Sequence, residues 1–291
     1  MDFFYPYPPL IAGILIKRYK RFLADVELDN GEIVTAHCPN TGPMTGVCQV
    51  GAQVYLSKSD NPQRKLAYTW EMIEIDGTWV GVNTALPNRV IKQALADRIF
   101  ANLTSSYDAF KPEVPYGKNK KSRIDFLLTK PEQKSIYVEV KNTTLAQEKL
   151  ALFPDTETTR GQKHLQELID ILPTARAVML YFINRSDCTH FSPGDAFDRR
   201  YGELFRQAIA AGVEVMPCRF MVNPEGVKFL GMAELVVWQF IRRVKIDYLP
   251  SFSPCYYYHG HHRRWRLGNI SRTCRLPKTD PAKFAWDRAP L

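Results

Sequence analysis

The sequence lacks long apolar stretches and closely paired cysteines. No apolar run reaches the roughly 18 residues that a membrane-spanning helix needs, so a membrane function is not expected. The opening segment is broken by prolines and carries Asp2 in place of basic residues, so we expect no signal peptide. The six cysteines are scattered and form no Cys-x-x-Cys pair, which argues against a disulfide framework or a zinc site. Reduced thiols in a cytoplasmic protein are the expected state.

The 291 residues carry a formal net charge of +9 that is unevenly distributed. Residues 236–291 hold 11 basic and 3 acidic residues, so the other 28 basic and 27 acidic residues nearly balance. We expect residues 241–291 to be a basic extension that is not required for folding. The overall charge is therefore weak evidence for nucleic-acid binding by the rest of the chain. There, the local clusters of basic residues are the relevant evidence.

Residues 10–82 have the pattern of a small all-β domain. Short strand-like runs alternate with turns, and Asp29-Asn30-Gly31 is a strong hairpin signal. A closed or partly open barrel would remove the exposed sheet edges. The expected strands are residues 11–17, 22–28, 32–37, 50–56, 68–75 and 78–82.

After residue 83 the pattern changes to that of an α/β domain, and we place the boundary at residues 82–88. Asn88 is expected to cap a helix that presents Ile91, Leu95 and Ile99 on one face. Later segments alternate between apolar runs and amphipathic helices, which predicts a sheet with crossover helices. The expected elements are strands 124–128, 136–140, 177–183 and 213–216, helices around 165–172 and 201–209, and a hairpin at 223–226.

Two carboxylates and a lysine lie on neighbouring predicted strands. Strand geometry points Glu139 and Lys141 to one face and Val140 to the other. If the hairpin is centred on Glu132, Asp125 lies opposite Glu139, on the same face. Carboxylates about 5 Å apart repel each other. A divalent cation held by Asp125, Glu139 and the Val140 carbonyl would relieve that repulsion.

Such a cluster is suited to phosphodiester hydrolysis. Mg²⁺, or Mn²⁺ in its place, would polarise the phosphate and lower the pKa of a bound water. Asp125, Glu139 and Lys141 would be the catalytic residues, with Lys141 orienting water or stabilising negative charge. The alternative is an exposed Glu139–Lys141 ion pair that contributes little to stability.

Seven stretches between about residues 10 and 236 together carry a family resemblance. They are residues 18–26 (RYKRFLADV), 36–42 (AHCPNTG), 60–65 (DNPQRK), 83–88 (NTALPN), 122–127 (SRIDFL), 153–155 (FPD) and 160–165 (RGQKHL). In combination they resemble the sugar fermentation stimulation protein A family, which has no counterpart of the basic extension.

The resemblance implies an OB-like β-barrel over residues 1–82 and a restriction-endonuclease-like, PD-(D/E)xK, α/β domain over residues 83–240. Asp125, Glu139 and Lys141 match the metal-binding and catalytic motif of that nuclease superfamily. The family is described as DNA-binding and is linked to the regulation of sugar utilisation. Nuclease activity is implied by the fold.

Basic side chains are expected to follow a nucleic-acid backbone, with the interleaved aromatics Tyr19 and Phe22 as stacking surfaces. The alternative is that these aromatics belong to the core and the cations are only solvated. Gln162, Lys163 and His164 begin the predicted helix, away from most of its apolar stripe, and could reach toward the carboxylates or toward phosphate. The alternative is that they are polar only because the helix surface is solvated. The expected nucleic-acid-binding residues are Lys17, Arg18, Lys20, Arg21, Lys120, Lys121, Arg123, Gln162 and Lys163.

We therefore expect a cytoplasmic DNA-binding protein without sequence preference that carries a nuclease-like Mg²⁺ site. The alternative is a Mg²⁺-dependent nuclease acting on DNA. DNA is the expected partner, and no membrane is involved.

Overall fold

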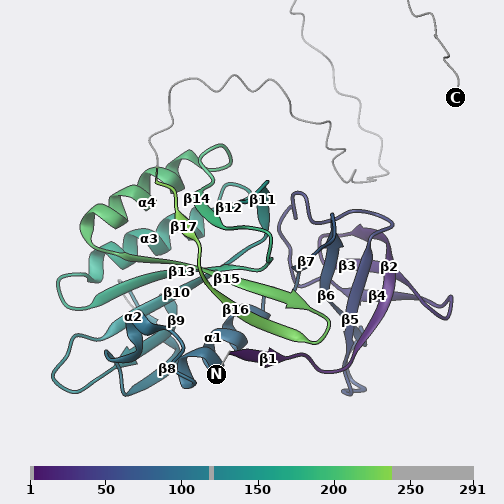
Figure 1. The fold of residues 1–291 in the computed structure, drawn as a ribbon, viewed down its shortest axis with the longest axis horizontal. Coiled ribbons are helices and arrows are strands. Elements are labelled where there is room, and N and C mark those ends of the chain that lie inside the picture. Colours follow the sequence, from purple (N-terminus) through teal and green to yellow (C-terminus); the bar gives the residue numbers. More distant parts are fainter. Residues whose placement is uncertain (1–2, 118–120, 238–291) are drawn as a thin grey trace, which may run out of the picture. The chain divides into compact units, whose positions relative to one another are not determined.

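A computed structural model describes residues 3–117 and 121–237 (Figure 1). Lys120 and the basic extension predicted over residues 241–291 lie outside the described residues. None of the helices in the described ranges is long and apolar enough to cross a membrane.

The N-terminal domain is a closed barrel, as its turn-punctuated strands predict. The strand order is β4-β3-β2-β5-β6-β7, and a further pairing of β4 with β6 closes five strands on themselves. Trp70, Leu15 and Leu56 are fully buried in its core. The strands are β2 (Leu10–Tyr19), β3 (Leu23–Leu28), β4 (Ile33–His37), β5 (Gln53–Lys58), β6 (Tyr68–Ile75) and β7 (Thr78–Gly81).

Local turn chemistry explains where the barrel strands begin and end. Gly31 closes the β3–β4 hairpin with a φ of 81°, which glycine adopts without strain. The strand expected from residue 50 begins only at Gln53, because Gly51 (φ 84°) lies in a turn and Val50 is exposed.

The second domain is built on a seven-stranded sheet of order β1-β16-β15-β13-β10-β9-β8. The central strands β10, β13 and β15 are parallel, as the predicted crossover helices require. The sheet strands are β1 (Phe4–Pro6), β8 (Ala109–Tyr116), β9 (Ser122–Thr129), β10 (Ile136–Thr143), β13 (Arg176–Ile183), β15 (Glu214–Asn223) and β16 (Gly226–Met232). Because β1 pairs with β16, the first residues of the expected 1–82 domain belong to this sheet.

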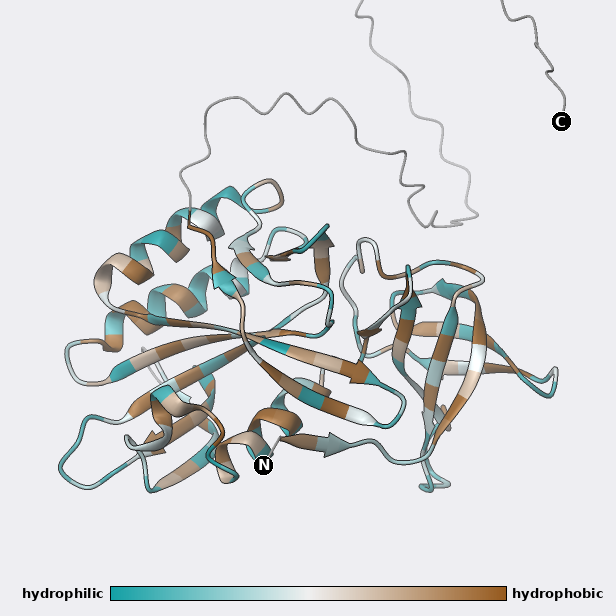
Figure 2. Ribbon diagram, in the orientation of Figure 1, coloured by the Kyte–Doolittle hydropathy of each residue, from teal (hydrophilic) through white to brown (hydrophobic). Residues whose placement is uncertain are grey.

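Helices cover both faces of the sheet. α1 (Leu86–Ala96) and α2 (Ala101–Thr104) pack with Val138, Val178 and Leu180 on one face. α3 (Thr159–Ile171) and α4 (Arg199–Ala211) pack with Met179 and Tyr181 on the other. Both long helices alternate hydrophobic and hydrophilic segments in Figure 2, and β13 is buried on both faces, as its apolar run predicts.

A smaller sheet, of order β11-β12-β14-β17, was not expected from the sequence. Its strands are only two to four residues long, too short to show a period. They are β11 (Leu145–Gln147), β12 (Leu150–Phe153), β14 (His190–Pro193) and β17 (Glu234–Leu235).

The start of α1 differs from the prediction. The helix begins at Leu86, with a proline in its first turn, and Ala85 is its N-terminal cap residue. Asn88 therefore lies inside the helix and does not cap it.

Candidate functional site

Glu139 and Lys141 lie on the face of β10 that α3 covers, as strand alternation predicts. Val138 and Val140 pack on the opposite face, with the core beneath α1. The Lys141 Nζ lies 2.7 Å from the Glu139 Oε1. These side chains are only 13% and 4% exposed. The alternative of an exposed surface ion pair is therefore wrong.

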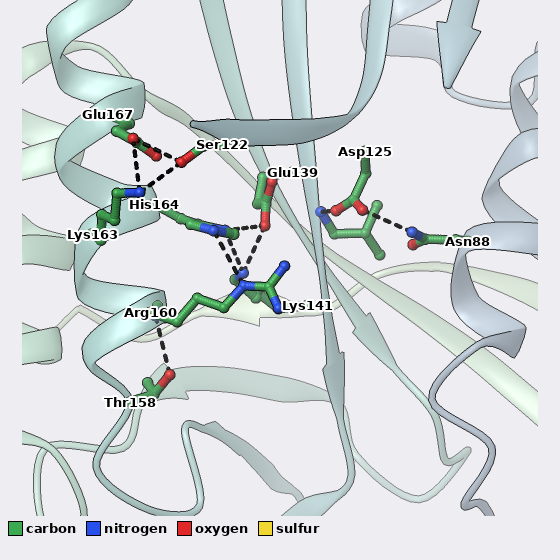
Figure 3. A network of polar contacts seen from close by, with 12 residues as sticks. Asn88, Ser122, Asp125, Glu139, Lys141, Thr158, Arg160, Lys163, His164 and Glu167 are labelled. Carbon is green, nitrogen blue, oxygen red and sulfur yellow. Dashed lines mark hydrogen bonds and ion pairs between the residues drawn. The ribbon is translucent and has the colours of Figure 1, made fainter. Parts of the chain in front are cut away.

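His164, from α3, completes this cluster. Its Nδ1 contacts the same Glu139 Oε1 and lies 3.1 Å from the Lys141 Nζ (Figure 3). The Arg160 Nε lies 3.5 Å from the other His164 ring nitrogen. The side-chain cap of α3, in which Thr158 accepts a hydrogen bond from the Gly161 N–H, fixes the start of the helix, one turn before His164.

Burial alone would raise the pKa of Glu139, but its partners reverse the shift. The positive charge of Lys141 and the hydrogen bond and charge of His164 lower the Glu139 pKa below its ordinary value. Its second oxygen, Oε2, is buried without a hydrogen-bond partner. A buried carboxylate oxygen in this state has capacity for one more donor or for a cation.

The predicted register of the β9–β10 hairpin is confirmed. Ile136 pairs with Leu128 and Val138 with Phe126, so the hairpin is centred on Glu132. The regular pairing of the two strands ends there, one residue before Asp125 would meet Glu139. The prediction that both carboxylates share one face is wrong.

Asp125 lies on the other side of β10 from Glu139 (Figure 3). Its two oxygens accept hydrogen bonds of 2.7 Å from the Val140 N–H and from the Asn88 side chain on α1. The β8–β9 pairing omits both Asp125 and Glu113 opposite, whose φ is 54°, while the register on either side is unchanged. The change of face of β9 at Asp125 coincides with this interruption.

Asp125 and Glu139 nevertheless remain within electrostatic reach of each other. Burial and then the negative charge of Glu139 raise the pKa of Asp125 to about 6, against opposing hydrogen bonds from Val140 and Asn88. Within residues 3–117 and 121–237, no three His, Cys, Asp or Glu side chains are grouped to hold a metal ion. A cation here would rely on two carboxylates together with main-chain or water oxygens.

The polar residues at the start of α3 have different roles. Gln162 donates hydrogen bonds of 3.0 Å to both oxygens of Asp198, the cap of α4, so its amide joins the two helices. Lys163 is half-exposed, donates to the Ser122 hydroxyl at 2.9 Å and pairs with Glu167. Of the predicted nucleic-acid contacts on α3, Lys163 is thus accessible, whereas Gln162 serves the fold.

The basic residues near the β2–β3 turn of the barrel also differ in their contacts. Arg18 donates from one nitrogen to the carbonyls of Arg21, Asn40 and Gly42, at 2.7 to 2.9 Å, and so clamps two loops together. Arg18 thus has a structural role in the barrel, and its contact with nucleic acid stays a prediction. Arg21 donates through Nε to the Thr41 carbonyl.

Other cations of the two domains are exposed. Lys17 is 61% exposed, pairs with Asp25 at 3.2 Å and lies over the Tyr19 ring. Phe22 is 45% exposed, so the alternative that it belongs to the core is wrong. The remaining exposed cations among the predicted residues are Lys20, Arg21, Lys121 and Arg123.

One residue of the site was missed by the sequence reasoning. Asn88 is expected as a helix cap, although it holds Asp125. Of the three polar residues expected to reach toward the site from the start of the helix, His164 does so. Its spacing four residues before Leu168 places it on the buried face of α3.

The fold and the site define a two-domain protein in which an OB barrel precedes an α/β domain carrying an Asp and a Glu-x-Lys motif. The family model for the SfsA N-terminal OB domain matches residues 16–82, and that for the sugar fermentation stimulation protein RE domain matches residues 85–226. The chain belongs to the sugar fermentation stimulation protein family.

Relatives support this assignment. The chain is 95% identical over 237 residues to the sugar fermentation stimulation protein homolog of Synechocystis sp., a match covering 81% of this chain and 100% of the relative. It is 69% identical over 234 residues to the Picosynechococcus sp. homolog, covering 79% of this chain and 93% of the relative. The structure of Pyrococcus furiosus SfsA in complex with Ca²⁺ has the same fold, with a TM-score of 0.72 and 24% identity, covering 81% of this chain and 99% of that one.

The raised pKa of Asp125 predicts a pH-dependent stability difference. Folded Asp125 keeps its proton up to about pH 6, whereas the unfolded chain loses it near pH 3.8. The contribution of Asp125 is therefore fully present below pH 4 and is lost as the pH rises through 6. Asn cannot ionise, so Asp125→Asn should gain up to about 3 kcal/mol of unfolding free energy relative to wild type between pH 4 and 7.

Urea unfolding of both proteins across this pH range, without divalent ions, measures the difference. Asp108→Asn, at an exposed aspartate, is the matched control and should track wild type. If the difference in unfolding free energy between Asp125→Asn and wild type does not change with pH, the raised pKa of Asp125 is contradicted.

Proposed function

We propose that this protein binds DNA through its backbone charge, without reading sequence, and carries a nuclease-like centre that takes Mg²⁺. The observation that carries the proposal is the buried Glu139–Lys141–His164 cluster with exposed cations beside it. Arg123 is on β9, the strand that carries Asp125, and Lys163 is next to His164 on α3. Both can meet phosphates as they approach the cluster.

The barrel supplies a second basic surface. Lys17, Lys20 and Arg21 lie around the β2–β3 turn, and the exposed ring of Phe22 follows them directly in the chain. Exposed cations next to an exposed ring combine backbone attraction with base stacking. This combination favours nucleic acid over a purely solvated surface.

A divalent cation fits the donor chemistry of the site. Glu139 has an unpartnered buried oxygen. Asp125 is close enough for the charge of Glu139 to disfavour its ionised form. Both groups offer the hard oxygen ligands that Mg²⁺ and Mn²⁺ prefer, and the Val140 carbonyl is the third proposed ligand. The Pyrococcus furiosus protein is described in complex with Ca²⁺, another ion that prefers oxygen ligands, and this supports the proposal.

The proposed setting is the cytoplasm, where the buried thiols of Cys38, Cys188 and Cys218 would stay reduced. A role in regulating sugar metabolism is proposed from the family name alone.

Binding to backbone charge predicts a steep salt dependence. The dissociation constant of a random DNA duplex, measured by fluorescence anisotropy in EDTA, should rise steeply with salt, with a log–log slope of about 0.9 per phosphate contacted. The double variant Lys17→Ala/Lys20→Ala should lower that slope by about 1 to 2, since it removes two cations. Lys92→Ala, on exposed α1 surface, is the control. Failure to bind single- or double-stranded DNA at low salt would refute the proposal.

The second candidate function is phosphodiester hydrolysis, which the unpartnered Oε2 of Glu139 specifically favours. Bound Mg²⁺ would polarise the phosphate and supply an activated water. Lys141 places its ammonium group beside Glu139, where it would orient that water or stabilise developing negative charge. His164 and Glu139 hold the lysine in place through contacts of 3.1 and 2.7 Å.

Hydrolysis predicts loss of turnover in three variants. With Mg²⁺ or Mn²⁺, wild type should cleave DNA, and Asp125→Asn, Glu139→Gln and Lys141→Ala should each lower the rate at least about 100-fold. Gel-based cleavage of DNA and RNA substrates measures the rate, and circular dichroism checks folding. Lys92→Ala should retain wild-type activity. Cleavage that survives in all three site variants would come from another protein, and no cleavage by wild type would leave DNA binding alone.

A further inference from the structure

A pocket lies at the seam between the barrel and the α/β domain, outside the Glu139 cluster. Its volume is about 150 Å³. Asn40 comes from a barrel loop, Thr84 from the segment joining the domains, and Asn142, Phe153 and Asp155 from the α/β domain. The pocket therefore requires both domains.

The seam around the pocket is held by hydrogen bonds. The Thr84 hydroxyl donates to the Pro39 carbonyl at 3.1 Å, and the Gly81 N–H donates to the Asn184 carbonyl at 2.9 Å. Asn184 also donates to the Asn142 Oδ1 at 3.0 Å. This bond fixes the Asn142 amide and leaves its Nδ2 group for another partner. The polar lining is thus oriented before any ligand binds.

The lining indicates what the pocket can hold. In the described part of the chain no lysine or arginine lines it, so it offers no site for a phosphate. It combines amide and hydroxyl groups and the Asp155 carboxylate with two leucines and Phe153, whose ring also packs against Tyr181 and Tyr201. An uncharged flat ring with a hydrogen-bonding edge matches this combination.

The volume selects the size of the ring. A cavity of about 150 Å³ in another protein accommodates benzene, a single six-membered ring. The same volume here fits one pyrimidine and is tight for the two fused rings of a purine. Asn142 directly follows Lys141 on β10, so the pocket and the proposed phosphate-handling lysine lie at the same end of one strand.

From these observations we infer that the pocket binds one pyrimidine base of a nucleic-acid strand whose backbone lies along the basic surface. The inference rests on the proposed DNA binding and adds base preference to it. The base would stack on Phe153, and the Asn142, Thr84 and Asp155 side chains would meet its polar edge. A single pocket distinguishes a pyrimidine from a purine at one position only. The protein would therefore still bind DNA without recognising a defined sequence.

The test compares three fluorescein-labelled single strands of twelve nucleotides by anisotropy: oligothymidylate, oligoadenylate and an abasic strand of equal charge. Wild type should bind oligothymidylate about tenfold more tightly than the abasic strand, which is within the range for one stacked base. It should also prefer oligothymidylate to oligoadenylate.

Thr84→Trp places a large side chain at the exposed rim of the pocket and should bring oligothymidylate binding to the level of the abasic strand. Binding of the abasic strand itself should not change. Thr84→Ser keeps the hydroxyl and should behave as wild type. Free thymidine at millimolar concentration should compete with oligothymidylate in wild type, a readout that needs no variant.

The outcomes separate the two claims. Equal binding of thymidylate and abasic strands by wild type, or a base preference that survives in Thr84→Trp, would overturn the pocket and leave DNA binding in place. Equal or tighter binding of oligoadenylate would overturn the pyrimidine assignment. No binding of any strand at low salt would overturn the proposed function itself.

Discussion

Two carboxylates lie beside one strand of the sheet, Glu139 buried and Asp125 partly buried, and each is held by partners from a different helix. A buried charge without partners is strongly destabilising. Glu139 is stabilised by Lys141 and His164, which requires α3 to cover that face of β10. Asp125 is stabilised by the Val140 N–H and by Asn88, which requires α1 to cover the other face. Burial and then the repulsion by Glu139 raise the pKa of Asp125. Each helix, packed on the sheet through its apolar face, thus contributes one side chain that holds a carboxylate.

The same strand links the proposed functions. β10 carries Glu139 and Lys141 on the face beneath α3 and receives the Asp125 hydrogen bond at Val140. Asn142, one residue further, lines the pocket at the seam with the barrel. Exposed cations of β9, α3 and the β2–β3 turn are available to a nucleic-acid backbone, while Arg18 and Gln162 make internal hydrogen bonds. We propose that these neighbouring parts of the fold attract a nucleic-acid strand, contact its phosphate and select one of its bases.

Turn residues and hydrophobic periodicity predicted the regular helices and strands of this fold. The features that were missed depend on packing between residues far apart in the sequence. The β9–β10 register follows from a short loop centred on Glu132, and α4 ends at Gly212 because glycine adopts its φ of 110° freely. β8 was missed because it contains two prolines, which strands tolerate at the edge of a sheet. The interruption of the β8–β9 pairing at Glu113 and Asp125 involves that missed strand, so alternation within β9 alone could not reveal it. Likewise, the use of Asn88 by Asp125 depends on α1 packing against the sheet, which spacing in the sequence does not encode.

We propose that the unpartnered oxygen of Glu139 and the nearby Asp125 together bind a divalent cation. Isothermal titration of Mn²⁺ into the metal-free protein examines this proposal without DNA and without turnover. We expect saturable binding of one ion per chain that Glu139→Gln weakens at least tenfold and that Lys92→Ala leaves unchanged. The absence of saturable binding, or equal binding by wild type and Glu139→Gln, would contradict it.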